Sequence, residues 1–437
     1  MKLRLLTFIS LACISLYASA VPAEEAKLDQ LSLSAANALF RSNSRELLLS
    51  RRMLEGAEAS AVVAAQQPNP VLSLGLTNFN LNRNQANANA NGGNSLADKT
   101  LNSTIQINQL FERGDKREIR IKAAADAIKA SSYDLKDMQR QQSLQLASAY
   151  YDLTLAQQSE KIQASNIALY EKTLQAAELR LKAGDIAFSD VARIRIDVLR
   201  AKNDWRQSIA NRQKAQANLA YLIGKEKQAN SIVASDSWTS AYASSADSDN
   251  SLQLENKLNQ RADILAAEAR TQQADENRRL ANALKSRNID VGIQYQHFPG
   301  QGPAAGDNTV GAFVTIPLFT NYQYQGEVAR AEVDFNAAED AKEHARAVAI
   351  GEISRARADL SAAMEKVQRF DEQMLREAQK AASAAEFAYQ QGAKGVTDLL
   401  DSRRVLRALQ LDAATAHADY AKAFAVWQAV TNTEENT

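Results

Sequence analysis

The chain has 437 residues, with 51 basic and 51 acidic side chains, so its formal net charge at pH 7 is zero. This balance argues against a nucleic-acid-binding protein, which needs a basic surface. The length allows two or three domains, or one continuous body built from a repeat.

The first 20 residues are typical of a secretory signal peptide. Lys2 and Arg4 give a positive start, a short apolar stretch follows, and Ala18-Ser19-Ala20 forms an A-x-A cleavage site. Cys13, the single cysteine, lies inside this segment, so a mature chain starting near Val21 would have no thiol for a disulfide or a metal site. Lipidation of Cys13 is the alternative, although Ser10 stands where lipidated proteins usually carry a large aliphatic residue.

After the signal, no run of roughly 18 apolar residues is present, so the sequence predicts no membrane-spanning helix. Alanine-rich helical periodicity extends from Leu33 to Gln67, and Pro68-Asn69-Pro70 ends it. Two segments then alternate between apolar and polar residues, which predicts strands at about 71–79 and 103–110. The asparagine-rich stretch 80–94 between them is interpreted as an exposed loop.

A helical pattern then continues up to Leu181, which at about 1.5 Å per residue gives a helix on the order of 100 Å long. A helix of that length needs neighbours along it. A second helical pattern returns from Ser189 to about Gly224 with an a/d-like apolar stripe, which suits antiparallel coiled-coil packing. The turn at about 182–190 is therefore the tip of a long helical hairpin.

The same order of elements occurs twice. Residues 225–251 show little periodicity and form a connector, with Trp238 as the residue that docks it. Helix is predicted for 252–288, strands for about 289–298 and 309–318, and a second tip for about 390–398. Gly184 and Gly392 are 208 positions apart, and so are Leu110-Phe111 and Leu318-Phe319. We therefore predict a signal peptide (1–20), a first repeat (21–224), the connector and a second repeat (252–437).

The four strands each have one apolar and one polar face and are close to the roughly 9–11 residues that cross a bilayer at a tilt. A sheet packed on a helical layer is the simpler alternative. Strands enter a bilayer only as a closed barrel, and four are too few, so closure would need two or three chains. The predicted lipid-facing residues are Leu72, Leu74, Leu76, Ile105, Ile107, Ile289, Val291, Ile293, Val310, Ala312, Val314 and Ile316.

The chain resembles the TolC-like outer-membrane efflux family over nearly all of its mature length. The resemblance rests on Leu33-Ser34-Ala35-Ala36 with Pro68-Asn69-Pro70, on Gln260-Arg261-Ala262-Asp263-Ile264, and on the two glycine-containing tips. Glu112-Arg113-Gly114-Asp115-Lys116-Arg117 is similar to a pattern of the CzcC-like heavy-metal branch. The second repeat departs from the family pattern at Asn321-Tyr322, where a glycine is usual.

This resemblance implies a mainly α fold with a small β part: a homotrimer with an α-helical barrel below a 12-stranded transmembrane β-barrel. The protein would be a passive exit duct in the outer membrane, extending into the periplasm. Its partners would be a periplasmic adaptor (membrane fusion protein), an inner-membrane pump of the RND type and outer-membrane lipid. The cargo would be heavy-metal cations, with organic compounds or a secreted polypeptide as alternatives.

No catalytic constellation or cofactor motif is present in the sequence, which predicts a non-enzymatic protein. The three histidines, His297, His344 and His417, lack the spacing of metal ligands and are interpreted as surface or packing residues. The rival function is a periplasmic coiled-coil adaptor or scaffold, which explains the hairpins but not the amphipathic strand pairs. An enzyme is a more distant alternative.

The tips carry the functional hypothesis. Gly184 and Gly392 would adopt the left-handed conformation that ends a helix, and Ser189 and Thr397 would cap the next one. Acidic rings and carboxylate–arginine links would form a periplasmic gate, so alanine at Asp190 and Asp398 would raise conductance. The gate residues are Asp185, Asp190, Arg193, Arg195, Asp398, Asp401, Arg403 and Arg404. The tip-turn and adaptor-docking residues are Lys182, Ala183, Gly184, Ser189, Gln390, Gln391, Gly392 and Thr397.

Overall fold

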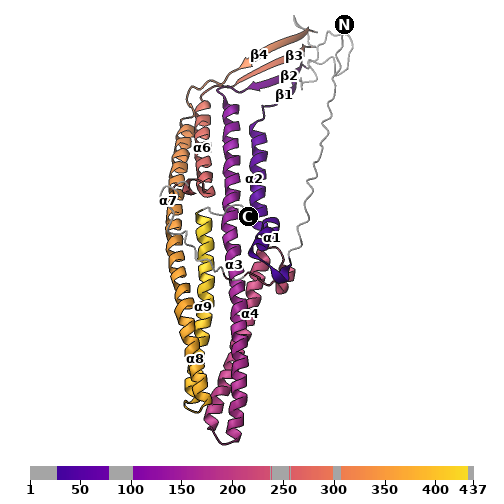
Figure 1. The fold of residues 1–437 in the computed structure, drawn as a ribbon. Coiled ribbons are helices and arrows are strands. Elements are labelled where there is room, and N and C mark those ends of the chain that lie inside the picture. The colour runs from indigo at the N-terminus through magenta and orange to yellow at the C-terminus, as the bar shows by residue number, and fades with distance from the viewer. Residues whose placement is uncertain are drawn as a thin grey trace, which may run out of the picture. The chain divides into compact units, whose positions relative to one another are not determined.

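The computed structural model describes residues 27–77, 102–236, 238, 255, 257–298 and 307–431 (Figure 1). The predicted signal peptide with Cys13, the asparagine-rich loop and most of the connector lie outside these residues. The chain divides into two units, Met1–Ser42 with Ala149–Ser237 and Asn43–Ser148 with Trp238–Thr437. One long helix, α3 (Lys116–Lys182), contributes residues to both units.

The first unit is a helical hairpin with two short extended segments, around Leu31 and Ala234, that pair with each other. It contains η1 (Leu28–Gln30), α1 (Leu33–Asn43), the later part of α3, α4 (Phe188–Leu222) and η4 (Glu226–Ser231). Val191, Ile194, Val198 and Ala201 of α4 are buried, which confirms this part of the predicted coiled-coil stripe. The hydroxyl of buried Tyr150 donates to the carbonyl of Leu31 (2.9 Å) and accepts from the amide of Asp236 (3.1 Å), so α3 binds both of these segments.

The second unit combines a sheet with helices that leave from it. Its helices are α2 (Arg45–Ala64), the first part of α3, α6 (Ala262–Ala283), α7 (Gln325–Arg369), α8 (Leu375–Gln390) and α9 (Val396–Val430). A π-helical turn, η6 (Phe370–Met374), joins α7 to α8. The apolar core of this unit includes Leu360, Phe370, Tyr420 and Trp427, so it is built mainly where α7 and its continuation pack on α9.

The sheet has four antiparallel strands in the order β1-β2-β3-β4. The strands are β1 (Val71–Thr77), β2 (Asn102–Phe111), β3 (Ile289–Phe298) and β4 (Asp307–Thr315). Helices α2, α3, α6 and α7 all join the sheet at one end, as Figure 1 shows. Because β1 and β4 are the outer strands, each has one edge that no described strand of this chain pairs with.

The strand register confirms the predicted apolar face. Leu72 pairs with Ile107, Ile107 with Ile293 and Ile293 with Ala312, and the same alignment holds along the strands. Asparagine, glutamine and threonine lie on the opposite face, together with Gly292, over which the ring of Phe313 packs so closely that a Cβ would collide with it. The assignment of Ile316 to a strand was wrong, because β4 ends at Thr315, two residues before Pro317.

The helices of the two hairpins repeat closely along the sequence. Helices α4 and α9 each have 35 residues, and both the start and the end of α9 lie 208 positions after those of α4. Helix α3 ends at Lys182 and α8 ends at Gln390, again 208 positions later. The π turn breaks this agreement: the sequence predicts an uninterrupted helix up to the second tip, whereas residues 370–374 are wound differently.

Two predicted helices are shorter than expected. The segment 33–67 is not one helix, because Ser44 adopts extended backbone angles and its side chain caps α2 by accepting from the amide of Leu47. The segment 252–288 is also interrupted, since Arg261 has extended backbone angles and α6 begins only at Ala262. Among the described residues, none of the helices combines the length and the apolar character that crossing a membrane requires.

Candidate functional site

The first tip is closed by a left-handed glycine, as predicted. Gly184 has φ +79° and follows the last turn of α3. Its amide donates to the carbonyl of Leu181 (3.0 Å), and the amide of Asp185 donates to that of Arg180 (2.9 Å). These two bonds satisfy carbonyl groups that the end of α3 would otherwise leave unpaired.

The second tip repeats this geometry 208 positions later. Gly392 has φ +73°, its amide donates to Tyr389 (3.1 Å), and the amide of Ala393 donates to Ala388 (2.9 Å). The predicted capping residues are wrong in both tips. The N-caps are Ala187 and Gly395, without a capping side-chain bond, so Ser189 and Thr397 lie inside the first turn of α4 and α9.

Most of the predicted gate and docking residues are exposed to solvent. Asp190 is half-buried, and Arg404 pairs with Asp401 on the same helix (3.1 Å). Arg403 is the exception, with 5% of its side chain exposed. The exposed ones are Lys182, Ala183, Gly184, Asp185, Ser189, Arg193, Arg195, Gln390, Gln391, Gly392, Thr397, Asp398, Asp401 and Arg404.

Two ion pairs that the sequence did not predict join the arms of the hairpins. Arg195 of α4 contacts Glu178 of α3 (2.8 Å), and Arg403 of α9 contacts Glu386 of α8 (3.0 Å). Both arginines were selected from the sequence, but their partners were expected among the tip aspartates. The 208-residue offset relates Glu178 to Glu386 and Arg195 to Arg403, so the repeat itself contained the missing signal.

The two ion pairs differ in burial. The side chain of Arg195 is 52% exposed, whereas that of Arg403 is 5% exposed. An exposed pair contributes little because water and salt screen it, but a buried guanidinium depends on its partners. The second hairpin is therefore the one whose packing depends on its arginine.

The motif Glu112 to Arg117 ties helices to the sheet. Gly114 (φ +76°) turns the chain from β2 into α3, which brings the Lys116 ammonium to the Ser286 carbonyl and the Asn288 side chain (2.6 Å each). Arg117 donates to the carbonyl of Ala65, after α2 (2.8 Å). The start of α3 is thus bonded to the chain before both β1 and β3.

The pKa values of Glu112 and Lys116 reflect the contacts at this junction. Both carboxylate oxygens of Glu112 accept from Arg120 (2.5 and 2.8 Å), and this hydrogen bonding holds the pKa of Glu112 below its usual value. Burial lowers the pKa of Lys116. The motif that resembles the heavy-metal branch therefore has a structural role in this chain, at the meeting point of helices and sheet.

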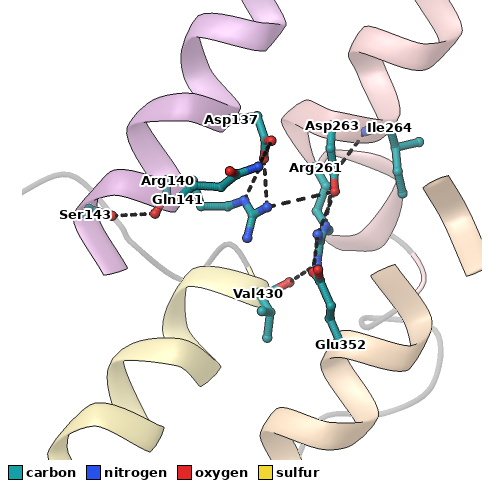
Figure 2. A network of polar contacts seen from close by, with 9 residues as sticks. All are labelled: Asp137, Arg140, Gln141, Ser143, Arg261, Asp263, Ile264, Glu352 and Val430. Carbon is teal, nitrogen blue, oxygen red and sulfur yellow. Dashed lines mark hydrogen bonds and ion pairs between the residues drawn. The ribbon is translucent and has the colours of Figure 1, made fainter. Parts of the chain in front are cut away.

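A buried arginine organises the second unit (Figure 2). Arg261 is 1% exposed and donates to Asp263 (2.7 and 3.1 Å), to Glu352 of α7 (2.7 Å) and to the carbonyl of Val430 at the end of α9 (3.4 Å). Arg140 of α3 lies 4.0 Å from the Asp263 carboxylate. One guanidinium thus connects α6, α7 and α9, and Asp263 extends the network to α3.

The charges in this network stabilise one another. Burial raises the pKa of Asp263, but hydrogen bonds from Arg261 and the charges of Arg261 and Arg140 outweigh it, so this pKa lies below its usual value. A pocket of about 530 Å³ adjoins the network. Its lining residues are Arg140, Gln141, Leu144, Glu352, Arg355, Ala356, Asp359, Val426 and Val430. The sequence singled out Arg261 and Asp263 only through the family resemblance.

The histidines make separate contacts. His297 contacts Asn308 across the sheet (2.9 Å), His344 is exposed on α7, and His417 contacts Asp371 (3.1 Å). Within the described ranges, no group of three or more His, Cys, Asp or Glu side chains is placed to hold a metal ion.

Comparison with known proteins identifies the family. The outer membrane efflux protein family matches residues 38–225 and 254–432, which is most of the chain. The chain belongs to this family. It is a TolC-family efflux channel, a transport protein of the outer membrane that extends into the periplasm and not an enzyme.

The individual relatives of this TolC-family channel are distant. The cobalt-zinc-cadmium resistance protein CzcC of Cupriavidus metallidurans is 22% identical over 86% of this chain and 84% of its own length. The outer membrane protein VceC of Vibrio cholerae has a TM-score of 0.74 at 20% identity, covering 91% of this chain and 95% of VceC. The CmeC channel of Campylobacter jejuni has a TM-score of 0.75 at 14% identity, covering 94% and 88%. These structures support the fold.

Proposed function

We propose that three copies of this TolC-family channel close a 12-stranded β-barrel in the outer membrane, continued by an α-helical barrel, as a passive exit duct. The family forms trimers that work in tripartite pumps. The observation that carries the proposal is the sheet, in which β1 and β4 each have one edge without a described partner strand and eleven of the twelve predicted apolar residues lie on one face. On closure, β4 of one copy runs antiparallel to β1 of the next, and the apolar face contacts lipid.

The helices next to these edges support the same closure. Helix α2 leads into β1 and α7 leaves from β4, at the same end of the sheet. Leu49, Met53 and Val63 of α2 and Val333 of α7 are each more than 60% exposed. Joining β4 of one copy to β1 of the next would bring these apolar helix faces together, which removes them from water.

Cysteine cross-linking across the two edges tests this closure. A single cysteine at Gly75 of β1 is combined in turn with one at Thr309, Gly311 or Phe313 of β4, in a protein whose one natural cysteine is Cys13. Oxidation in membranes should join chains into dimers and trimers for at least one register, seen as bands on a denaturing gel. Cysteine at Thr104 of the inner strand β2 with the same β4 partners is the control. Absence of inter-chain bonds at every register would contradict the proposal.

The tips are the proposed periplasmic entrance, with the exposed turns around Gly184 and Gly392 as the surface for an adaptor that connects to an RND-type inner-membrane pump. The two repeats, 21–224 and 252–437, would each supply one tip per protomer. Three protomers would then place six tips around the entrance. The matching hydrogen bonds of the two turns support this equivalence.

Heavy-metal cations are the proposed cargo, supported by the similarity to the cobalt-zinc-cadmium resistance protein. Deleting the gene for this channel in its native host should lower growth on Co²⁺, Zn²⁺ or Cd²⁺, and a plasmid copy should restore it. If the deletion lowers tolerance only to organic dyes or abolishes polypeptide secretion, the metal assignment is wrong and those cargoes replace it.

A further inference from the structure

The π turn in the second hairpin has no counterpart in the first. Residues Phe370–Met374 form one wide turn, in which the amide of Leu375 donates to the carbonyl of Phe370, five positions earlier. Counting back 208 positions from Asp371 leads to Gln163, where α3 is a continuous α-helix. Such turns weaken the regular ladder of helix hydrogen bonds and often mark functional positions.

Side chains hold the π turn from two directions. Phe370 is 7% exposed and belongs to the core with Ala416 and Tyr420 of α9. The carboxylate of Asp371, the next residue, contacts Nε2 of His417 on α9 (3.1 Å). Arg376 donates to the carbonyl of Glu372, a backbone group inside the turn. Two consecutive residues of the turn, Phe370 and Asp371, thus both contact α9.

Trp238 contacts one member of this pair. Its ring stacks on that of His417, with centroids 5.9 Å apart and an interplanar angle of 21°. The side chain of His417 is 22% exposed and that of Asp371 is 37% exposed, so water reaches the pair only in part. Stacking fixes the orientation of the imidazole, which in turn keeps Nε2 directed at the Asp371 carboxylate.

We propose that Trp238, His417 and Asp371 form a clamp that stiffens the second hairpin at its π turn. Trp238 comes between the two repeats in the sequence, and through this clamp it would stiffen a helix more than 130 residues further along the chain. The first repeat lacks the clamp, since the positions equivalent to Asp371 and His417 are Gln163 and Ile209. Any effect on transport rests on the proposed role of the tips as the entrance.

Hydrogen–deuterium exchange of the intact trimer tests the clamp. In the Trp238→Ala and His417→Ala variants, amides of 370–376 should exchange roughly threefold to tenfold faster than in the wild type, as expected for loss of one aromatic stack. Amides of 162–168 in the first hairpin should not change. Trp238→Phe keeps a stacking ring and should stay at the wild-type rate, and so should His344→Ala, which removes an exposed histidine of α7.

Unchanged exchange at 370–376 in both clamp variants would overturn the proposal, and so would an equal increase in both hairpins, because that indicates general loosening. Single-channel conductance of Trp238→Ala in a planar bilayer is measured in parallel. Faster local exchange with altered conductance supports the clamp and its effect on the entrance. Faster exchange with wild-type conductance supports the clamp alone and counts against the tips as the entrance.

Discussion

Replacing Arg261 with methionine should lower the free energy of unfolding of the second unit by about 2–4 kcal/mol. Methionine fills a similar volume but leaves Asp263, Glu352 and the Val430 carbonyl without their donor. The range stays below that of a fully buried ion pair, because Asp263 and Glu352 keep 23% and 33% of their side chains exposed. Chemical unfolding followed by the helical circular dichroism signal measures the loss.

Arg355→Met is the matched control, since it removes an exposed arginine from the same helix α7, close to Glu352. It should change stability by no more than about 0.5 kcal/mol. The double variant Arg261→Met/Glu352→Gln should recover part of the loss, because one unpaired carboxylate disappears. Equal stability of the Arg261→Met and Arg355→Met proteins would show that the buried network contributes nothing.

The pH dependence of the free energy of unfolding tests the same network independently. The folded-state pKa of Asp263 lies below its unfolded value, so its contribution is complete above the unfolded pKa of about 3.9 and is lost as the pH falls through the folded one. The stability difference between wild type and Arg261→Met should therefore be constant near neutral pH and shrink below about pH 4. A difference that stays constant into strong acid would assign the loss to packing instead.

Replacing Arg403 with alanine should open the second tip and raise single-channel conductance in a planar bilayer several-fold. The side chain of Arg403 is 5% exposed and contacts Glu386 on the opposite arm (3.0 Å). Its removal costs the hairpin packing about 1–3 kcal/mol, limited by the 40% exposure of Glu386. Conductance follows from this loosening if the tips form the entrance.

The repeat supplies a matched control at the equivalent position of the first hairpin. Arg195→Ala breaks the contact with Glu178, but both side chains of this pair are more than 40% exposed, so the cost should be at most about 1 kcal/mol. Conductance of this variant should stay near the wild-type value. If both alanine variants behave alike, burial of Arg403 does not matter for the entrance.

Periodicity predicted the regular part of the fold from the sequence. The alternation of apolar and polar residues with a period of two located the four strands. The register places eleven of the twelve selected strand residues on one face, and only Ile316 lies outside the strands. The 208-residue offset located both tips, because a left-handed turn at Gly184 and Gly392 leaves a clear sequence signal. These features depend on local backbone preferences.

The remaining features depend on tertiary contacts. Ser44 interrupts a helical pattern without a proline or glycine, and the π turn has an ordinary helical sequence. Local preferences would also cap a helix with Ser189 or Thr397, yet the N-caps lie two residues earlier, at Ala187 and Gly395. Two partners of Arg261, Glu352 and the Val430 carbonyl, are 91 and 169 positions away, so neighbouring residues could not have revealed them.

The hydrogen bonds from Lys116 and Arg117 at the start of α3 restrict which residues can change during evolution. Lys116 and Arg117 donate to backbone carbonyls, at Ser286 and Ala65, and Lys116 also donates to the side chain of Asn288. Residue 65 can therefore change identity without breaking its bond to Arg117, whereas Lys116 and Arg117 must keep their donors. Position 286 is more restricted, because the Ser286 side chain lies so close to Gly114 that a Cβ there would collide with it. Distant relatives should therefore vary most at position 65 and should retain long basic side chains at 116 and 117, glycine at 114 and a side-chain acceptor at 288.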